Sequence, residues 1–257
     1  ISSTAHSTDS GFYDFEISQS LRFDGSSYLR RTPSSAGNRK TWTWSGWVKR
    51  TKLDSSQMLF TSYDGTGNTF GTELRYIYDG GSSGVENSLQ INNFTDGSPA
   101  KTLPVHRDTS SWGHLVVSVD TTLNTGNALD RAKFYLNGEQ LAGDSSSSLS
   151  LDYETHINKT VAHTIGNRTQ NNTLYFFGYL ANIQFIDGQA LNPYYFGRLK
   201  NGSVWIPKQF DGTASDTTYN VTGASNAYGT NGFSLTFSNA SDLGEDSSGN
   251  NNDWTVN

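Results

Sequence analysis

The chain has 257 residues, a formal net charge of −6 and no Cys, which excludes disulfides, thiolate metal sites and Cys nucleophiles. No apolar run approaches the roughly 20 residues that a helix needs to span a bilayer, which argues against membrane insertion. An acidic chain without a basic stripe is also a poor partner for nucleic acid.

Alternating apolar and polar residues, separated by Gly, Asn and Asp, predict short strands along most of the chain. The predicted strands cover residues 20–25, 27–30, 41–50, 57–63, 73–78, 87–94, 112–120, 161–167, 175–186 and 233–237. A hairpin is predicted over 131–141, because Asn137-Gly138 suits the positive φ angles of a type I′ turn. Residues 191–197 could form one helical turn. This pattern predicts an all-β fold, namely an antiparallel two-sheet β-sandwich of the jelly-roll kind.

Composition divides the chain into three parts. Residues 1–17 are rich in Ser and Thr and are expected to form an N-terminal arm or linker. Residues 18–200 carry most of the strand signals and are expected to form the jelly roll. For residues 201–257 two alternatives remain: the last strands of the sandwich, or the start of a following module. Because the chain starts at Ile1 and ends inside a polar motif, we expect a piece of a longer protein.

No catalytic constellation is evident. A retaining glycosidase holds two carboxyl groups about 5 Å apart, a spacing that positions i and i+2 of a strand can provide. Asp152 and Glu154 have this spacing but follow a Ser-rich loop. The five His residues are scattered, and neither Gly-x-Ser-x-Gly nor HExxH occurs. We therefore expect a protein that is not an enzyme.

The polar segment 246–254 has two interpretations, and a metal site is the less favoured of them. Asp246, Asn250 and Asp253, with Ser248, offer the oxygen ligands that Ca²⁺ prefers, although the spacing is not that of an EF-hand. The alternative is a polar turn held by side-chain hydrogen bonds to the backbone. No cofactor is required, and calcium remains a possibility at these three residues.

Candidate ligand-binding residues lie at predicted strand ends. A sugar site combines an aromatic surface for the C–H face with polar groups for the hydroxyls. The candidates are Tyr63, Asp64, Tyr78, Asp79, Asn167 and Arg168. The alternative is that they are ordinary rim residues. The large apolar residues Trp42, Trp44, Trp47, Phe60 and Phe134 are predicted to fill the core.

Four segments, taken in order, resemble one family. They are residues 20–29 (SLRFDGSSYL), 41–50 (TWTWSGWVKR), 132–141 (AKFYLNGEQL) and 163–191, which contains IGN, FGYL and DGQAL. They resemble the concanavalin A-like lectin/glucanase superfamily in its laminin-G-like and pentraxin-like branch. The resemblance spans residues 20–197 and implies a jelly roll of two antiparallel sheets. The Glu-x-Asp-x-Glu triplet of the superfamily's glucanases is missing from this sequence, which implies a non-catalytic member.

Residues 20–50, with DSSGNNNDWT at 246–255, are similar to lectin-like domains in virion proteins of marine tailed phages. That resemblance implies a tail-fibre or adhesin domain on the virion surface, outside the cell, that binds host-surface glycan. It also implies other virion proteins as partners and a homo-oligomer, for which a trimer is plausible. The alternative is a structural virion protein, a capsid decoration or connecting domain without sugar binding. An active glycanase is the least favoured alternative.

Overall fold

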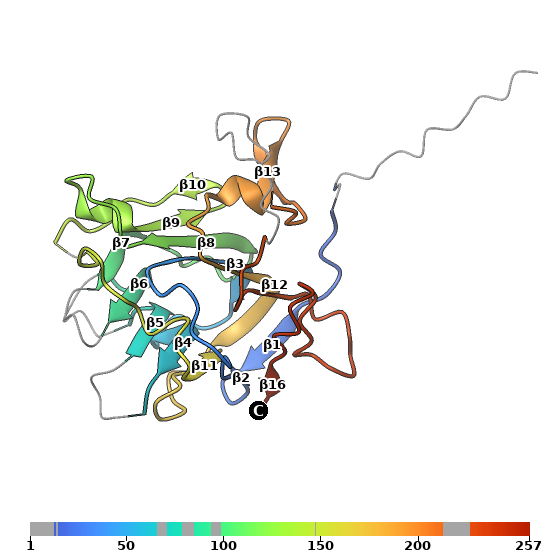
Figure 1. Ribbon diagram of the computed structural model, residues 1–257. Helices are drawn as coiled ribbons and strands as arrows, with labels where there is room; N and C mark the ends of the chain where they lie inside the picture. The colour runs from blue at the N-terminus through green and yellow to red at the C-terminus, as the bar shows by residue number, and fades with distance from the viewer. Residues whose placement is uncertain are drawn as a thin grey trace, which may run out of the picture.

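The computed structural model describes residues 13, 15–65, 71–78, 85–93, 99–146, 148–212 and 227–257. Their strands form two seven-stranded antiparallel sheets and one separate two-stranded ribbon. The two large sheets pack face to face (Figure 1). The predicted all-β, two-sheet antiparallel sandwich is therefore confirmed.

Sheet A contains the longest strands. Its order is β1 (Leu21–Asp24), β12 (Phe177–Asp187), β3 (Thr41–Arg50), β8 (Gly113–Asp120), β9 (Ala132–Leu136) and β10 (Glu139–Gln140), and β15 (Phe233–Leu235) also pairs with β12. The register of β12 against β3 shifts between Ala181 and Gln184, where Asn182 has a φ of 46°. This bulge separates the half of β12 that pairs with β1 from the half that pairs with β15. Gly46 of β3 lies opposite this bulge, and the extra residue belongs to β12.

Sheet B has the order β16 (Thr255–Val256), β2 (Leu29–Arg31), β11 (Ala162–Ile165), β4 (Gln57–Tyr63), β5 (Gly71–Tyr76), β6 (Ser88–Asn93) and β7 (Ala100–Val105). The ribbon pairs β13 (Gly197–Lys200) with β14 (Val204–Pro207), and two short 3-10 helices are η2 (Ala128–Arg131) and η3 (Pro193–Tyr195). The strand prediction misses β7, which contains Pro104 and lies at a sheet edge, where proline is tolerated. No helix in the described part of the chain has the length and apolar character of a membrane span.

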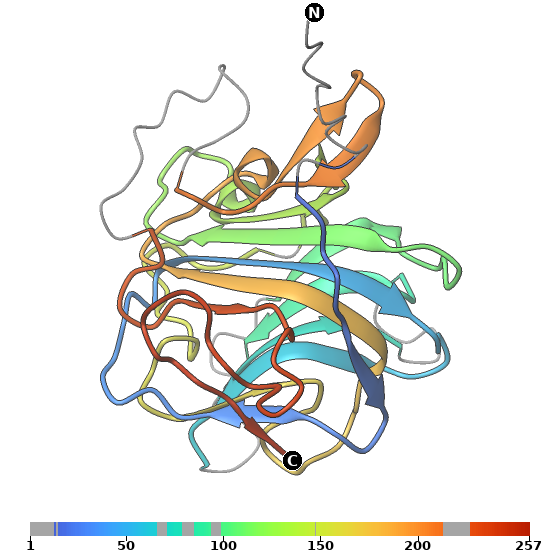
Figure 2. The same ribbon diagram turned by 90° about the vertical axis from the view of Figure 1, so that its right-hand side faces the viewer.

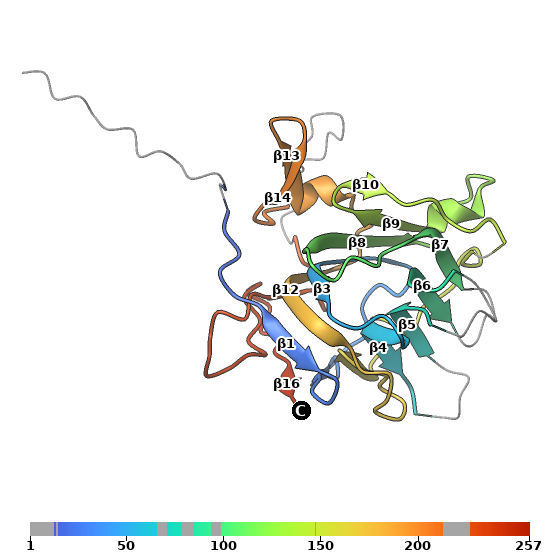
Figure 3. The same cartoon turned by 180° about the vertical axis from the view of Figure 1, so that it is seen from behind.

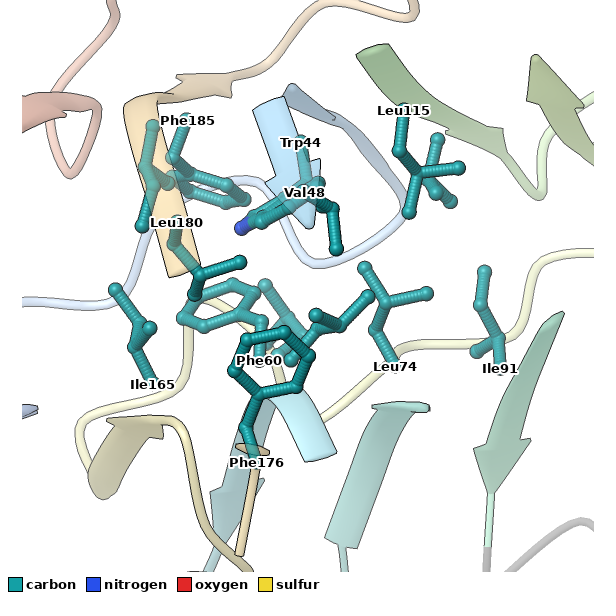
Figure 4. Close-up of a cluster of buried hydrophobic side chains, with 14 of the residues drawn as sticks. Trp44, Val48, Phe60, Leu74, Ile91, Leu115, Ile165, Phe176, Leu180 and Phe185 are labelled. Carbon is teal, nitrogen blue, oxygen red and sulfur yellow. The ribbon is translucent and has the colours of Figure 1, made fainter. Parts of the chain in front are cut away.

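The core lies between the two sheets. Figure 4 shows side chains of sheet A, among them Trp44, Val48, Leu115, Leu180 and Phe185, above Phe60, Leu74, Ile91 and Ile165 of sheet B. Trp42, Trp44, Phe60 and Phe134 are buried in this core, as predicted. The core placement predicted for Trp47 is wrong. Side chains alternate between the faces of a strand, so Trp47 points away from the side that Trp44 and Val48 share.

Residues 227–257 contribute to both sheets. β15 pairs with β12 in sheet A, and β16 pairs with β2 in sheet B. Trp254 is buried, with ring centroids 4.9 Å from Phe233 and 6.1 Å from Phe60. In Figure 3 the loops of this last segment lie beside β1, and β16 leads to the C-terminus. These residues are therefore structurally part of the sandwich.

A second apolar cluster covers part of the outer face of sheet A. Val116 and Ile186 supply the sheet side, and Leu191, Tyr195, Phe196 and Phe210 pack over them. The rings of Phe196 and Phe210 stack with centroids 5.1 Å apart. Since β13 begins directly after Phe196, this packing anchors the ribbon, which rises above the sheet in Figure 2.

Candidate functional site

Three cross-strand neighbours form a row on the outer face of sheet A, next to the ribbon. Ala181 of β12 lies opposite Trp47 of β3, which in turn lies opposite His114 of β8. Residues directly opposite in antiparallel strands present their side chains on the same face. His114 stacks on Trp47 with centroids 5.1 Å apart and an interplanar angle of 26°. The small side chain of Ala181 leaves space on the other side of the indole.

Trp205, which β14 supplies, joins this row through His114. The two rings are nearly parallel at 18°, and the Trp205 indole N–H donates to Nδ1 of His114 across 2.9 Å. Because Nδ1 accepts, Nε2 carries the proton and donates to the Ser45 hydroxyl at 2.9 Å. Burial lowers the pKa of His114 to about 3, so the imidazole is neutral at ordinary pH.

Two glycines make room for Trp205. A Cβ at Gly138, in the β9–β10 turn, or at Gly197, in β13, would overlap the Trp205 ring. Tyr194 of η3 meets the same ring edge-on, with centroids 5.3 Å apart and an interplanar angle of 80°. The orientation of Trp205 is therefore set by contacts from three separate segments.

Two adjoining hollows share a wall formed by Trp47, Trp112 and Trp205. We call the two hollows together the tryptophan groove. The first hollow, about 470 Å³, lies between this wall, residues 15–20 and Ala181. The second, about 550 Å³, lies between the wall, the Asn137-Gly138-Glu139 turn and the ribbon. Trp112, which precedes β8, is 36% exposed and meets Tyr179 edge-on with centroids 6.3 Å apart.

The chemistry of the groove suits binding. Aromatic rings offer an apolar surface, and polar side chains stand around them. These polar residues are Glu16, Ser18, Gln19 and Ser20 in the first hollow and Asn137, Glu139 and Ser203 in the second. Concave sites that bind small molecules combine apolar walls with a few orienting polar groups. Each hollow is lined by one carboxylate among its described residues, so neither has the pair that glycoside hydrolysis requires.

Some of the ligand-binding residues predicted from strand ends gather on sheet B instead. Arg168 forms a bidentate ion pair with the buried Glu73, with Nε 2.6 Å and Nη2 3.2 Å from the carboxylate oxygens. Tyr63 is close by, and its pKa is raised by burial and further by Asp64. Asn167 is buried, and its carbonyl accepts hydrogen bonds from hydroxyls of sheet B. These contacts hold the loop after β11 on the sheet.

Of the other predicted ligand-binding residues, Asp64 adjoins this group, and Tyr78 lies away from it. Asp64 accepts from Nζ of Lys159 at 2.9 Å. Tyr78 lies at the opposite end of sheet B, since β4 and β5 pair Tyr63 with Gly71 at one end and Gln57 with Tyr76 at the other. Asp79 lies outside the described residues. The structure therefore does not bring the five described candidates together in one site.

The calcium candidates form a hydrogen-bonded turn. Oδ1 of Asp246 accepts from the amides of Ser234 and Ser248, and Oδ2 accepts from the amide of Asn252 and the Ser248 hydroxyl. Asp253 accepts from the amide of Asp246, and Asn250 donates to two backbone carbonyls. With N–H and O–H donors around Asp246, this arrangement does not fit a calcium ion, which needs a shell of oxygen atoms.

The two carboxylates with catalytic spacing pair with different cations. Glu154 contacts Arg39 at 2.7 Å, and Asp152 contacts Lys40 at 3.1 Å. Both carboxylates are more than half exposed. They serve as surface ion pairs here.

Trp47, Trp112, Trp205 and His114 are the site residues that sequence reasoning missed. The strand period carries a signal for Trp47, since it is out of phase with Trp42 and Trp44 along one strand. No local pattern marks the partnership of His114 with Trp205, which are 91 positions apart.

Comparison with known proteins identifies the family of this chain. Residues 23–194 match the family model of the concanavalin A-like lectin/glucanases superfamily, and the chain belongs to this superfamily. Trp205 and residues 15–20 lie outside the matched segment. No curated protein matches the sequence.

Several solved structures show similarity to this chain. A Bacteroides ovatus protein proposed to bind carbohydrate has a TM-score of 0.50 and 17% identity, over 67% of this chain and 44% of that protein. The present chain thus spans less than half of that relative. A SAP-like pentraxin from Limulus polyphemus has a TM-score of 0.48 and 16% identity, over 69% and 80% of the two chains. Domain 4 of the arabinanase AbnA from Geobacillus stearothermophilus, solved with arabinotriose, has a TM-score of 0.48 and 18% identity, over 70% and 75%. At 17% identity, the likeness to the B. ovatus protein concerns the fold alone.

Proposed function

We propose that this chain is a non-catalytic carbohydrate-binding domain and that the tryptophan groove is its binding site. The observation that carries the proposal is the convergence of Trp47, Trp112 and Trp205 on two adjoining hollows with polar rims. A sugar ring presents an apolar C–H face, which packs on an indole, and a hydroxyl perimeter, which needs donors and acceptors.

Membership of a lectin-containing superfamily and the B. ovatus relative support the proposal. The scattered carboxylates support binding without hydrolysis. Asp152 and Glu154 each pair with a surface cation, and Glu16 and Glu139 line different hollows.

For the biological setting, we propose a tail-fibre or adhesin domain on a virion surface, outside the cell, that attaches to host-surface glycan. The similarity of residues 20–50 and 246–255 to lectin-like phage domains supports this setting. A homo-oligomer, such as a trimer, would multiply weak contacts, because linked sites gain affinity through effective concentration.

A structural virion role is the second candidate. Leu199 and Val204 of the ribbon are 42% and 46% exposed, and both line the second hollow. Exposed apolar side chains on a projecting ribbon also suit contact with a neighbouring virion protein.

A glycan and bacterial-polysaccharide array, run with wild type, Trp112→Ala and Tyr78→Ala, tests the proposal. The two aromatic residues are similarly exposed, at 36% and 38%, but only Trp112 lines the groove. We expect selective binding that Trp112→Ala weakens at least tenfold, as expected for loss of an aromatic anchor worth about 2 kcal/mol. Tyr78→Ala should bind like wild type.

If folded wild type binds no glycan, the structural role is favoured. If only Tyr78→Ala loses binding, the site lies on sheet B.

A further inference from the structure

We infer that the tryptophan groove takes a neutral oligosaccharide of at least two sugar units, one in each hollow, and discriminates against acidic sugars. This inference rests on the proposed function and specifies its ligand class. It concerns a surface formed partly by residues 15–20 and 197–207, which lie outside the segment shared with the superfamily.

The two-unit length follows from the arrangement of the hollows. At about 470 and 550 Å³, each hollow alone falls within the roughly 300–1,000 Å³ typical of small-molecule sites. The same three indoles border both hollows, so a chain that crosses this wall can place successive rings against aromatic surface on either side. A single sugar would use only half of the available surface.

The preference for neutral sugars follows from the charges that line the groove. In the described part of the chain, Glu16 is the charged residue that lines the first hollow, and Glu139 is the one that lines the second. A carboxylate accepts hydrogen bonds from sugar hydroxyls and repels a uronic acid or sulfate group placed near it. Among the described residues, neither Lys nor Arg lines either hollow.

Two cations on the outer face of sheet A lie one row further along the strands. Arg22 and Lys49 flank Tyr179 as its cross-strand neighbours, and Lys49 is two positions beyond Trp47 on the same face of β3. They line neither hollow. An acidic glycan that reached them would leave the space bordered by Trp205, so Lys49 provides a test of this competing placement.

The experiment is calorimetric titration of the wild type with neutral oligosaccharides of one, two and four units. The cello-, xylo-, manno- and N-acetylchito-series are used, together with the glycans selected on the array, and tetragalacturonate is the acidic probe. We expect affinity to rise at least tenfold from one unit to two or four units of the preferred series. Tetragalacturonate should bind at least tenfold more weakly than the neutral tetramer.

Charge variants test the lining directly. Glu139→Gln and Glu16→Gln should each raise the affinity for tetragalacturonate several-fold. Glu154→Gln, at an exposed carboxylate of the β10–β11 connection, should change neither affinity. The inference is overturned if the monosaccharide binds as tightly as the tetramer, or if the two glutamine variants leave acidic binding unchanged. It is also overturned if tetragalacturonate binds as well as the neutral tetramer and Lys49→Ala abolishes this binding. Absence of binding to every array and titration glycan overturns the proposed function as well.

Discussion

The indole N–H of Trp205 donates a hydrogen bond to Nδ1 of His114 across 2.9 Å, although 91 positions separate the two residues. On its other side His114 stacks on Trp47, and its Nε2–H donates to Ser45. One buried imidazole thus joins the ribbon to sheet A and orients two of the three indoles that border the groove.

Replacing His114 by Phe keeps a flat ring but removes both hydrogen bonds. The Ser45 hydroxyl is buried and would lose its partner, at a cost of about 1–3 kcal/mol. We expect the free energy of unfolding in urea to fall by about that amount, and glycan affinity to fall several-fold because Trp205 loses its acceptor. Ser45→Ala serves as the control, since it removes one bond and should leave affinity near wild type. Equal glycan affinity of His114→Phe and wild type would show that His114 does not position Trp205.

The stability of the protein should fall in mild acid. Burial lowers the pKa of His114 to about 3 and that of His163 to about 4, from 6.5 in the unfolded chain. Between pH 6.5 and 4 the unfolded state therefore binds more protons than the folded state, and stability decreases as pH decreases. Each histidine contributes a slope that approaches about 1.4 kcal/mol per pH unit.

Urea titrations of wild type and His114→Phe from pH 7.5 to 4.5 measure this dependence. The variant should show a shallower pH dependence than the wild type, because one of the buried neutral imidazoles is gone. Parallel curves would mean that His114 is not the source of the acid sensitivity.

Gly197→Ala should move Trp205. The added methyl group would overlap the indole, and overpacking of this kind costs about 1–3 kcal/mol. We expect a changed tryptophan fluorescence spectrum and a several-fold loss of glycan affinity. Gly202→Ala is the control, since Gly202 has a φ of 71° at the ribbon turn and nothing near its Cβ position. It strains the turn without touching Trp205 and should retain more affinity than Gly197→Ala.

Asp246 should stabilise the fold through its hydrogen bonds, without a bound calcium ion. It is 7% exposed, and its two oxygens accept four hydrogen bonds. Asp246→Ala leaves several buried donors unpaired and is expected to cost about 3 kcal/mol or more in unfolding free energy. Thermal unfolding of the wild type should have the same midpoint with millimolar calcium as with EDTA. A midpoint that rises with calcium concentration would reveal a site that binds the folded state.

Trp254→Ala should destabilise the whole sandwich. The ring lies in the core against Phe60 and Phe233, and a Trp→Ala change in a core costs about 3–5 kcal/mol. A single cooperative transition at lower urea concentration is expected, followed by both near-UV and far-UV circular dichroism. Thr255→Ala, an exposed neighbour in β16, is the control and should change stability little. An unchanged midpoint for Trp254→Ala would mean that residues 227–257 are not needed to complete the fold.

The sequence by itself determined the fold class and many strand positions. The predicted strands at 41–50 and 57–63 coincide with β3 and β4, and the turn at Asn137-Gly138 joins β9 to β10. These features depend on neighbours in the chain, namely the two-residue period of a strand and the φ angles of turn residues. The same period also carries the outward position of Trp47, although that residue was predicted to lie in the core.

Only the tertiary structure decided how distant segments share a surface. The strands around residues 21–24 and 29–31, close in sequence, enter different sheets, and residues 233–235 and 255–256 join one sheet each. Trp205 reaches His114 because Phe196 and Phe210 dock the ribbon on sheet A and because Gly138 and Gly197 leave space for the indole. No local pattern encodes such an arrangement, because it depends on which apolar faces remain to be buried once the sheets have formed.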